Sequence, residues 1–146
     1  MINSNCYILL ISFAFVLVGC TSIKKGLIPN NNAGGYKVLV VQKQDKINPD
    51  RLIIKGRVLD AKTGKPLQIA VLKIECSTIK ASIKGEYLYE TTKSAYKYFF
   101  IEAICYNYKS VDTKYLDIQD KDELQIDFYL EEYDNPILNC EGYLND

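Results

Sequence analysis

The sequence predicts an all-β protein whose main domain is a Greek-key β-sandwich of about seven strands. Three observations support this prediction. Short runs of β-branched and aromatic residues recur at the roughly 8–12-residue spacing that is typical of sandwiches and barrels. Several of these runs alternate apolar and polar residues, as half-buried strands do. No segment after the first twenty residues shows a sustained helical period.

The composition limits the range of functions. The 146 residues suffice for one domain with attachments, and 25% charged with 48% apolar residues is typical of a folded globular chain. The formal net charge is zero, which gives no reason to expect nucleic-acid binding. The chain has no His and no Trp, so the commonest general base, metal ligand and sugar-stacking ring are missing. We therefore expect no catalytic residue, no metal site and no cofactor.

The central stretch of the sequence is a strand that runs into a tight turn. Residues 52–59 form the expected strand, and Gly56 in its interior predicts a bulge or a close approach of another backbone. Residues 60–66 form the expected turn. Gly64 would supply a positive φ there, and Pro66 would end the ladder before the next strand.

The remaining strands are expected where β-rich runs lie between polar turns: Tyr36 to Lys43, Ile69 to Cys76, Ile79 to Ser82, Glu86 to Glu90, Tyr96 to Tyr106, Val111 to Leu116 and Leu124 to Leu130. A turn is expected at Gly85. The first run is apolar at its centre, which predicts that both of its faces are covered. The run from Tyr96 is expected to be the longest strand.

Three of these strands have a face without charges, which we assign to the core. The alternation places these side chains inward: Ala70, Leu72, Ile74 and Cys76; Phe99, Ile101, Ala103 and Cys105; Leu124, Ile126, Phe128 and Leu130. In the last strand Gln125, Asp127 and Tyr129 are expected to point outward.

The N-terminal segment is predicted to export the protein. Residues 7–18 are apolar except for Ser12, and this run is shorter than the roughly 20 residues that a membrane-spanning helix needs. It fits the core of a signal peptide. The run ends in Leu-Val-Gly19-Cys20, which resembles the bacterial lipobox. The resemblance implies cleavage between Gly19 and Cys20 and lipidation of Cys20; the alternative is an ordinary secretory signal followed by a Cys.

This interpretation divides the chain into four parts. Residues 1–19 are the signal peptide, and residues 20–35, rich in Asn and Gly, are a flexible tether carrying the lipid. Residues 36–131 are the sandwich, and residues 132–146 form an irregular acidic tail. Several acyl chains on one Cys anchor a protein stably, because each buried methylene contributes about 0.8 kcal/mol.

The turn motif resembles the opening of the carboxypeptidase regulatory-like domain family. The residues Gly56-Arg-Val-Leu-Asp-Ala-Lys-Thr-Gly-Lys-Pro-Leu67 match its Gly-x-Val-x-Asp, Thr-Gly and Pro-Leu elements, and Ala70-Val71 follows as in the family. Gly85-Glu86-Tyr87 is similar to its Gly-x-Tyr/Phe turn, while Asn107-Tyr108 stands where the family usually has Gly-Tyr.

The resemblance covers residues 52–130. It implies a seven-stranded, transthyretin-like Greek-key sandwich, of a kind often attached to bacterial membrane receptors or enzymes. The family has no shared catalytic residues, so the resemblance implies none here. A transthyretin relative that hydrolyses a purine breakdown product uses His, and this chain has none.

Two surface features are candidate binding sites. The first is a cluster of acidic residues: Asp117, Asp120, Asp122 and Glu123. Their oxygens could bind Ca²⁺, although a solvated loop is the favoured interpretation. The second is two pairs of tyrosines in which both members share one face of a strand: Tyr87 with Tyr89, and Tyr96 with Tyr98. Paired rings of this kind form a platform that could stack sugars or anchor a protein. Tyrosines also commonly fill strand positions without such a role.

The mature chain would retain Cys76, Cys105 and Cys140. An exported protein meets oxidising conditions, so a disulfide is permitted. Cys76 and Cys105 both fall on faces assigned inward. A bridge between them requires neighbouring strands or converging sheets, and buried free thiols are the alternative.

Together these features predict a bacterial lipoprotein anchored through acylated Cys20 to a membrane, with the outer membrane favoured, and facing the periplasm. Its sandwich is expected to be a non-catalytic interaction or structural module with an envelope protein as partner. The alternative is a glycan- or small-ligand-binding protein that uses exposed tyrosines.

Overall fold

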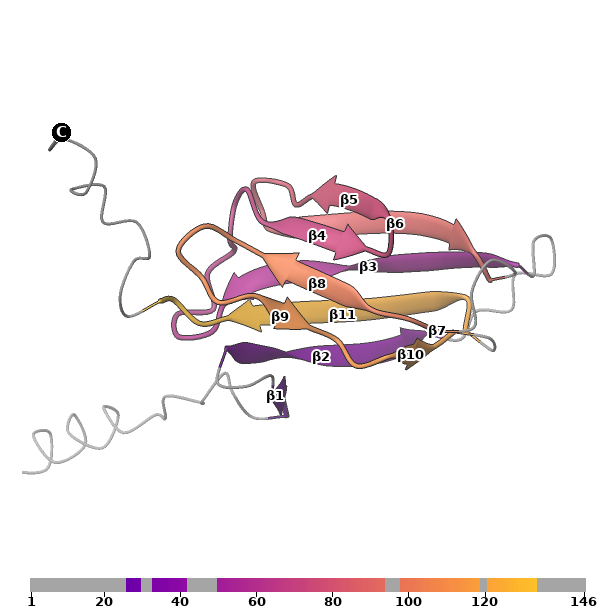
Figure 1. Cartoon of the computed structure of the whole chain (residues 1–146), viewed down its shortest axis with the longest axis horizontal. Coiled ribbons are helices and arrows are strands. Elements are labelled where there is room, and N and C mark those ends of the chain that lie inside the picture. The colour runs from indigo at the N-terminus through magenta and orange to yellow at the C-terminus, as the bar shows by residue number, and fades with distance from the viewer. Residues whose placement is uncertain (1–25, 30–32, 42–49, 94–97, 119–120, 134–146) are drawn as a thin grey trace, which may run out of the picture.

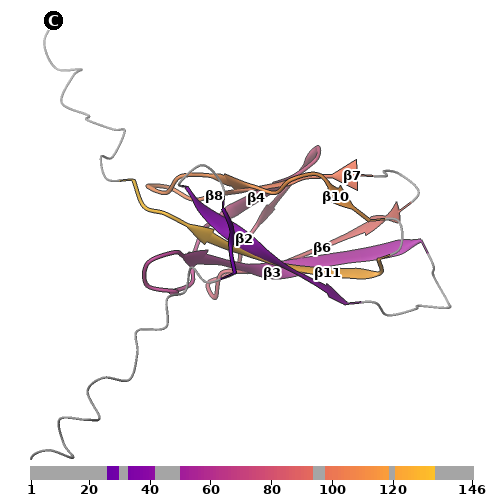
Figure 2. The same cartoon turned by 90° about the horizontal axis from the view of Figure 1, so that it is seen from below.

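The protein is described from a computed structural model that covers residues 26–29, 33–41, 50–93, 98–118 and 121–133. Within these ranges the chain is all-β, and two packed sheets form a β-sandwich (Figures 1 and 2). No helix in the described part is long and apolar enough to cross a membrane. The predicted fold class is therefore confirmed.

The larger sheet has five strands, in the order β1-β2-β11-β3-β6. Their bounds are Ile28–Pro29 for β1, Gly34–Val41 for β2, Glu123–Leu130 for β11, Arg51–Asp60 for β3 and Glu86–Thr92 for β6. Strand β11 pairs antiparallel with β2 and parallel with β3, and β3 pairs antiparallel with β6. The last strand of the described chain therefore lies in the centre of the sheet, between the first two long strands.

The second layer contains a four-stranded sheet and a two-stranded one (Figure 2). The four-stranded sheet has the order β5-β4-β8-β9, with bounds Ser77–Lys80, Val71–Ile74, Ile101–Ile104 and Val111–Asp112. Strands β10 (Leu116–Asp117) and β7 (Tyr98–Phe99) pair with each other. The chain passes from the first layer to the second after β3, returns for β6, crosses again for β7 to β10, and returns for β11. This return beside the first long strand is the Greek-key connection.

The core lies between the two layers. The alternating residues of β11 that were assigned inward are 0–1% exposed: Leu124, Ile126, Phe128 and Leu130. The ring of Phe128 lies 6.2 Å, centroid to centroid, from the rings of both Tyr36 and Tyr87. Ile101 and Ala103 of β8 and Leu72 and Ile74 of β4 face this cluster from the other layer, which confirms their inward assignment: all four are buried. The side chain of Phe99 lies outside the described part.

Two predicted strands are shorter than expected. The run from Tyr96 to Tyr106 does not form the longest strand, because it divides into β7 and β8 at Phe100; the longest described strand is β3, with ten residues. The run from Ile69 to Cys76 contracts to β4, because Ile69 and Glu75 adopt φ of 61° and 52°, which strand backbone cannot have. The sandwich is thus built from eleven strand segments in the described residues rather than about seven.

The N-terminal boundary of the folded domain is also corrected. Residues up to 35 were expected to be tether, yet Ala33 is buried in the core, β2 begins at Gly34 and Ile28 pairs with Tyr36. Conversely, β2 is not covered on both faces, because Leu39 is 58% exposed. The strand lies near the edge of the sheet, next to the short β1.

One outward side chain of β11 is buried as well. Tyr129 lies on the outer face, as the alternation predicts, but it is only 8% exposed. It packs with Leu59, Ala61 and Leu27 in a second small cluster, and the ammonium of Lys37 lies 5.3 Å from the centre of its ring. The segment before β2 therefore covers part of the outer face.

Candidate functional site

The turn after β3 is a network built around the carboxylate of Asp60. Gly64 has φ of 70°, as predicted, and its N–H donates to the Asp60 carbonyl at 2.8 Å. The Asp60 Oδ1 accepts from the N–H groups of Lys62 and Thr63 at 2.9 and 2.6 Å and from the Thr63 hydroxyl at 2.9 Å. Pro66 bridges to Leu59, where it follows the turn as expected. The motif that carries the family resemblance therefore has a structural role.

A second turn is attached to this network through Tyr108. Its hydroxyl donates to Asp60 Oδ2 at 2.9 Å. Asn107 adopts φ of 64°, the conformation that a Gly would supply, and Asn tolerates it better than most residues. Burial and the hydrogen bond to the Asp60 carboxylate raise the pKa of Tyr108 to about 12. Burial opposes ionisation of Asp60, but the bonds from Thr63, Tyr108 and Lys62 outweigh it and lower the pKa of that carboxyl.

The predicted turn at Gly85 is present, and its backbone supports the sheet. Gly85 has φ of 70° and donates its N–H to the Ser82 carbonyl at 2.8 Å. Its own carbonyl accepts from the N–H of Val58 at 2.8 Å. A Cβ at this position would lie 2.6 Å from the Val58 carbonyl oxygen, so only Gly fits.

The ladder between β3 and β11 is interrupted in the middle. The register pairs Lys55 with Gln125 and Val58 with Phe128 and skips the two residues between them on each strand. A Cβ on Gly56 would lie 1.8 Å from the carbonyl oxygen of Ile126. Gly56 therefore marks a close backbone approach, one of the two alternatives that the sequence left open.

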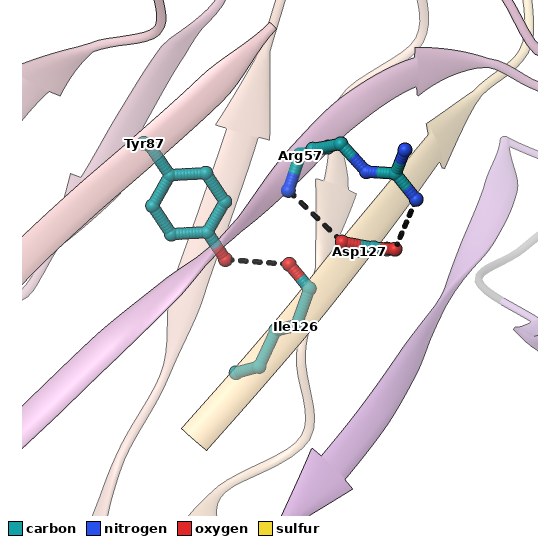
Figure 3. Close-up of polar contacts among 4 residues, drawn as sticks. All are labelled: Arg57, Tyr87, Ile126 and Asp127. Atoms are coloured by element: carbon teal, nitrogen blue, oxygen red, sulfur yellow. Dashed lines mark hydrogen bonds and ion pairs between the residues drawn. The ribbon is translucent and has the colours of Figure 1, made fainter. Parts of the chain in front are cut away.

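Side chains satisfy the backbone groups at this interruption (Figure 3). The backbone N–H of Arg57 donates to Asp127 Oδ1 at 3.0 Å, and its guanidinium donates to Oδ2 at 3.0 Å. The hydroxyl of Tyr87 donates to the carbonyl of Ile126 at 2.8 Å. Burial raises the pKa of Tyr87 well above its ordinary value, so the phenol stays a donor.

The tyrosines expected to form one platform are therefore core residues. Tyr87 is 5% exposed, and Tyr89 packs against the core with its hydroxyl 3.2 Å from that of Ser77. Of the two interpretations of Tyr87 and Tyr89, the surface platform is excluded and the filling of strand positions is confirmed, because this face of β6 is the inner face. Of the second pair, Tyr96 lies outside the described residues, and Tyr98 is 49% exposed.

Tyr98 belongs to a surface cluster that the sequence did not reveal. Phe100, two residues along, is exposed on the same segment, and Tyr115 is 75% exposed. The rings of Phe100 and Tyr115 meet edge to face, with centroids 5.9 Å apart and an interplanar angle of 82°. The β7–β10 pairing, in which Leu116 opposes Phe99, brings the two segments together. We call Tyr98, Phe100 and Tyr115 the aromatic cluster.

The aromatic cluster lies at one end of the sandwich. Strands β7 and β10 are at the end opposite the one where β2 begins and β11 ends (Figure 1). The end near the start of β2 carries the turns of Asp60 and Asn107. The chain thus enters and leaves the sandwich at one end, and the exposed rings lie at the other.

Two acidic residues where β11 begins are paired with lysines. Asp122 forms an ion pair with Lys93, and Glu123 forms one with Lys55 at 2.6 Å. Asp117 lies in β10, and Asp120 is outside the described residues. Within the described ranges, no three acidic or thiol side chains gather in a way that could hold a metal ion.

The two cysteines proposed for a bridge are free thiols in this structure. Cys76 was assigned inward, but the positive φ of Glu75 reverses the alternation after β4, and Cys76 is exposed in the turn to β5. Cys105 is buried, as predicted, and burial raises the pKa of its thiol. Because Val71 pairs with Ile104 and Ile74 with Ile101, the two cysteines lie at opposite ends of the β4–β8 pair.

The predicted lipidation and cleavage site, Cys20 and Gly19, lies outside the described residues, as does Cys140. In the described part, every buried side-chain nitrogen or oxygen has a hydrogen-bond partner. The interior therefore presents no polar side chain that awaits a ligand, and the aromatic cluster is the candidate functional site.

No protein-family model matches the chain. No curated protein matches it significantly.

Proposed function

We propose that this protein is a lipid-anchored lipoprotein of a bacterial envelope and that its β-sandwich is a non-catalytic interaction module. The anchor is Cys20, acylated after cleavage behind Gly19, on the periplasmic side of the outer membrane. The apolar run of residues 7–18 and the lipobox-like sequence that follows support the anchor. The resemblance of residues 52–130 to carboxypeptidase regulatory-like domains supports a module without catalytic residues.

The observation that carries the interaction role is the aromatic cluster. Aromatic side chains bury a large area on contact, and tyrosines are enriched among the residues that dominate protein interfaces. The cluster lies at the end of the sandwich away from the start of β2 (Figure 1). The rings are therefore exposed at the end opposite the one where the described chain enters the sandwich, where they are available to an envelope protein.

The distribution of polar groups favours binding over catalysis. The buried carboxylate of Asp60 is occupied by the turn and by Tyr108, and the Asp127 carboxylate is occupied by Arg57. Both carboxylates are thus used within the fold, and in the described part of the chain neither forms a carboxylate–histidine pair. The sequence contains no His that could complete such a pair.

A glycan or small ligand is the second candidate for the same cluster, favoured by the 75% exposure of Tyr115. A sugar ring stacks on the flat face of an aromatic side chain. The rings of Phe100 and Tyr115 are nearly perpendicular, at 82°, and so offer no shared flat surface. This geometry favours a protein partner, into which separate rings can insert as anchors.

The anchor is tested by labelling cells with a tagged fatty acid. Wild-type protein is expected to take up the label and to remain in the membrane fraction, while Cys20→Ala is expected to be unlabelled and either unprocessed or soluble. Equal labelling of the two forms would contradict the anchor.

The interaction role is tested by placing a photo-crosslinking amino acid at position 115 in one strain and at position 106 in another. Tyr106 is 65% exposed and follows β8, at the other end of that strand from the cluster, so it is a matched control. We expect one envelope protein, identified by mass spectrometry, to crosslink at 115 and not at 106, and Phe100→Ala to abolish that product. Identical crosslinked products at the two positions would contradict the interaction role. Binding of the purified protein to a glycan array that depends on Tyr115 would instead favour a glycan ligand.

A further inference from the structure

Strand β2 has a largely open edge. Strand β11 pairs with β2 along all eight residues on one side. On the other side β1 pairs with Gly35 and Tyr36, and no described strand pairs with residues 37–41. An edge of this kind presents a row of backbone N–H and C=O groups to which another strand can bind.

Beyond Lys37, this edge lacks the features that normally prevent strand addition. Residues 38–41 read Val-Leu-Val-Val, without charge or Pro, and their pairing with β11 contains no bulge. Both faces of the stretch carry an exposed aliphatic side chain: Leu39 on the outer face is 58% exposed, and Val40 on the inner face is 41% exposed. A strand added here would bury both.

The other edges of the described sheets are protected. Strand β6 has Glu86 and Glu90 exposed along its length, and β5 is four residues long with Thr78 and Lys80 exposed. Strand β9 has only two residues. Within the described part of the chain, β2 is therefore the edge that is both long and apolar.

We propose that the occupant of this edge is a second copy of the chain, paired antiparallel through β2 about a two-fold axis at Leu39. The register follows from the length of the open stretch. Because β1 occupies the edge at Tyr36, pairing that uses all of residues 37–41 must be centred on their midpoint, which is Leu39. Position 38 then opposes position 40 of the partner copy, and position 37 opposes position 41.

The side chains of β2 are self-complementary in this register. Leu39 meets Leu39 of the partner copy on the outer face, and Val40 meets Val38 on the inner face. Lys37 faces an aliphatic position rather than a second Lys, so no like charges oppose one another. The pairing extends the five-stranded sheet across the axis and covers the apolar edge in both copies.

The first test is disulfide trapping in native membranes, with the full-length lipidated protein. Leu39→Cys is introduced together with Cys76→Ser and Cys140→Ser, which leaves the buried Cys105. Residues opposed in antiparallel strands have Cα atoms about 4.5–5.5 Å apart, which suits a disulfide. The matched control is Leu88→Cys, because Leu88 is also 58% exposed but lies on β6 at the opposite edge of the same sheet.

We expect Leu39→Cys to give a product of twice the monomer mass on mild oxidation and Leu88→Cys to remain monomeric. The proposal is overturned if Leu39→Cys stays monomeric, if it forms a product of a different mass, or if both variants form the same amount of dimer.

The second test uses charge, because a residue on a two-fold axis meets itself. Leu39→Lys and Leu39→Glu should each lose the dimer when expressed alone, and co-expression of the two should restore it. Leu39 is exposed, so both variants should still fold and keep the circular-dichroism spectrum of the wild type. Persistence of the dimer in either single variant, or failure of co-expression to restore it, would rule out this axis.

Discussion

The hydroxyl of Tyr87 on β6 donates a hydrogen bond to the carbonyl of Ile126 on β11, across the intervening strand β3 (Figure 3). This carbonyl lies where the β3–β11 ladder is interrupted, over Gly56. A buried tyrosine thus replaces a hydrogen bond that the ladder does not make. The sequence left a surface position open for Tyr87 and a bulge open for Gly56. In the structure the two residues together support the centre of the sheet.

Removal of that hydroxyl should destabilise the domain. Tyr87→Phe keeps the ring against Phe128 but leaves the buried Ile126 carbonyl without this donor, so we expect a loss of about 1–3 kcal/mol in the free energy of unfolding. Tyr89→Phe is the matched control, because its hydroxyl meets only the half-buried Ser77 and its loss should cost less. Urea denaturation of both variants shows which hydroxyl contributes more to stability. Equal midpoints would contradict the proposal that the Tyr87 hydroxyl replaces a missing hydrogen bond of the ladder.

Gly56→Ala should be among the most damaging small substitutions. The added Cβ would lie 1.8 Å from the Ile126 carbonyl oxygen, and backbone on both strands would have to move. We expect a cost of about 2–3 kcal/mol, near the upper end for overpacking. Thr78→Ala, at an exposed position of β5, should change stability by less than about 0.5 kcal/mol. An unchanged denaturation midpoint for Gly56→Ala would show that the strands are farther apart.

Truncating one side chain on each face of β11 shows how much each face contributes to stability. Phe128→Ala removes a fully buried ring from the main core and should cost about 3–5 kcal/mol. Tyr129→Ala should cost about 1.5–3 kcal/mol, because its ring lies under Leu27 on the outer face rather than in solvent. Equilibrium unfolding measures both, and a negligible cost for Tyr129→Ala would show that the segment before β2 does not cover it.

Burial of Tyr108 and the hydrogen bonds to the Asp60 carboxylate should make stability depend on pH at both extremes. The folded pKa of Tyr108, about 12, lies above its ordinary value of 10.0, so its contribution is full below pH 10 and is lost as the pH rises toward 12. The folded pKa of Asp60 is lowered, so its contribution is present above its ordinary value of 3.8 and is lost as the pH falls.

Tyr108→Phe is therefore expected to cost about 1–2 kcal/mol at neutral pH and to flatten the alkaline fall in stability. The variant also deprives the Asp60 carboxylate of one donor, so acid unfolding should begin at higher pH. Thermal midpoints recorded from pH 3 to pH 11 test both limbs, and an alkaline limb identical to that of the wild type would exclude Tyr108 as its source.

The cysteines should differ sharply in reactivity. Cys76 is exposed and should react with a thiol reagent in the folded protein, whereas Cys105 should react only on unfolding, because burial both shields its thiol and raises its pKa. Mass spectrometry of peptides alkylated before and after denaturation separates the two. Protection of both thiols until a reductant is added would instead establish a disulfide.

The sequence by itself determined the features that depend on neighbouring residues. Alternation placed Leu124, Ile126, Phe128 and Leu130 in the core, and the positive φ at Gly64 and the turn at Gly85 followed from turn chemistry. Gly56 was recognised as a special backbone position. These features are local, because side chains alternate along a strand and a tight turn restricts which residues fit.

Only the tertiary structure decided which strands are neighbours and which faces are covered. Tyr87 became a core residue, the positive φ of Glu75 turned Cys76 outward, Phe100 met Tyr115, and no described strand covered residues 37–41 of β2. Each outcome depends on pairing between strands far apart in the chain. A run such as Val-Leu-Val-Val fits equally well at the centre or at the edge of a sheet, and its position is set by the strand that pairs beside it.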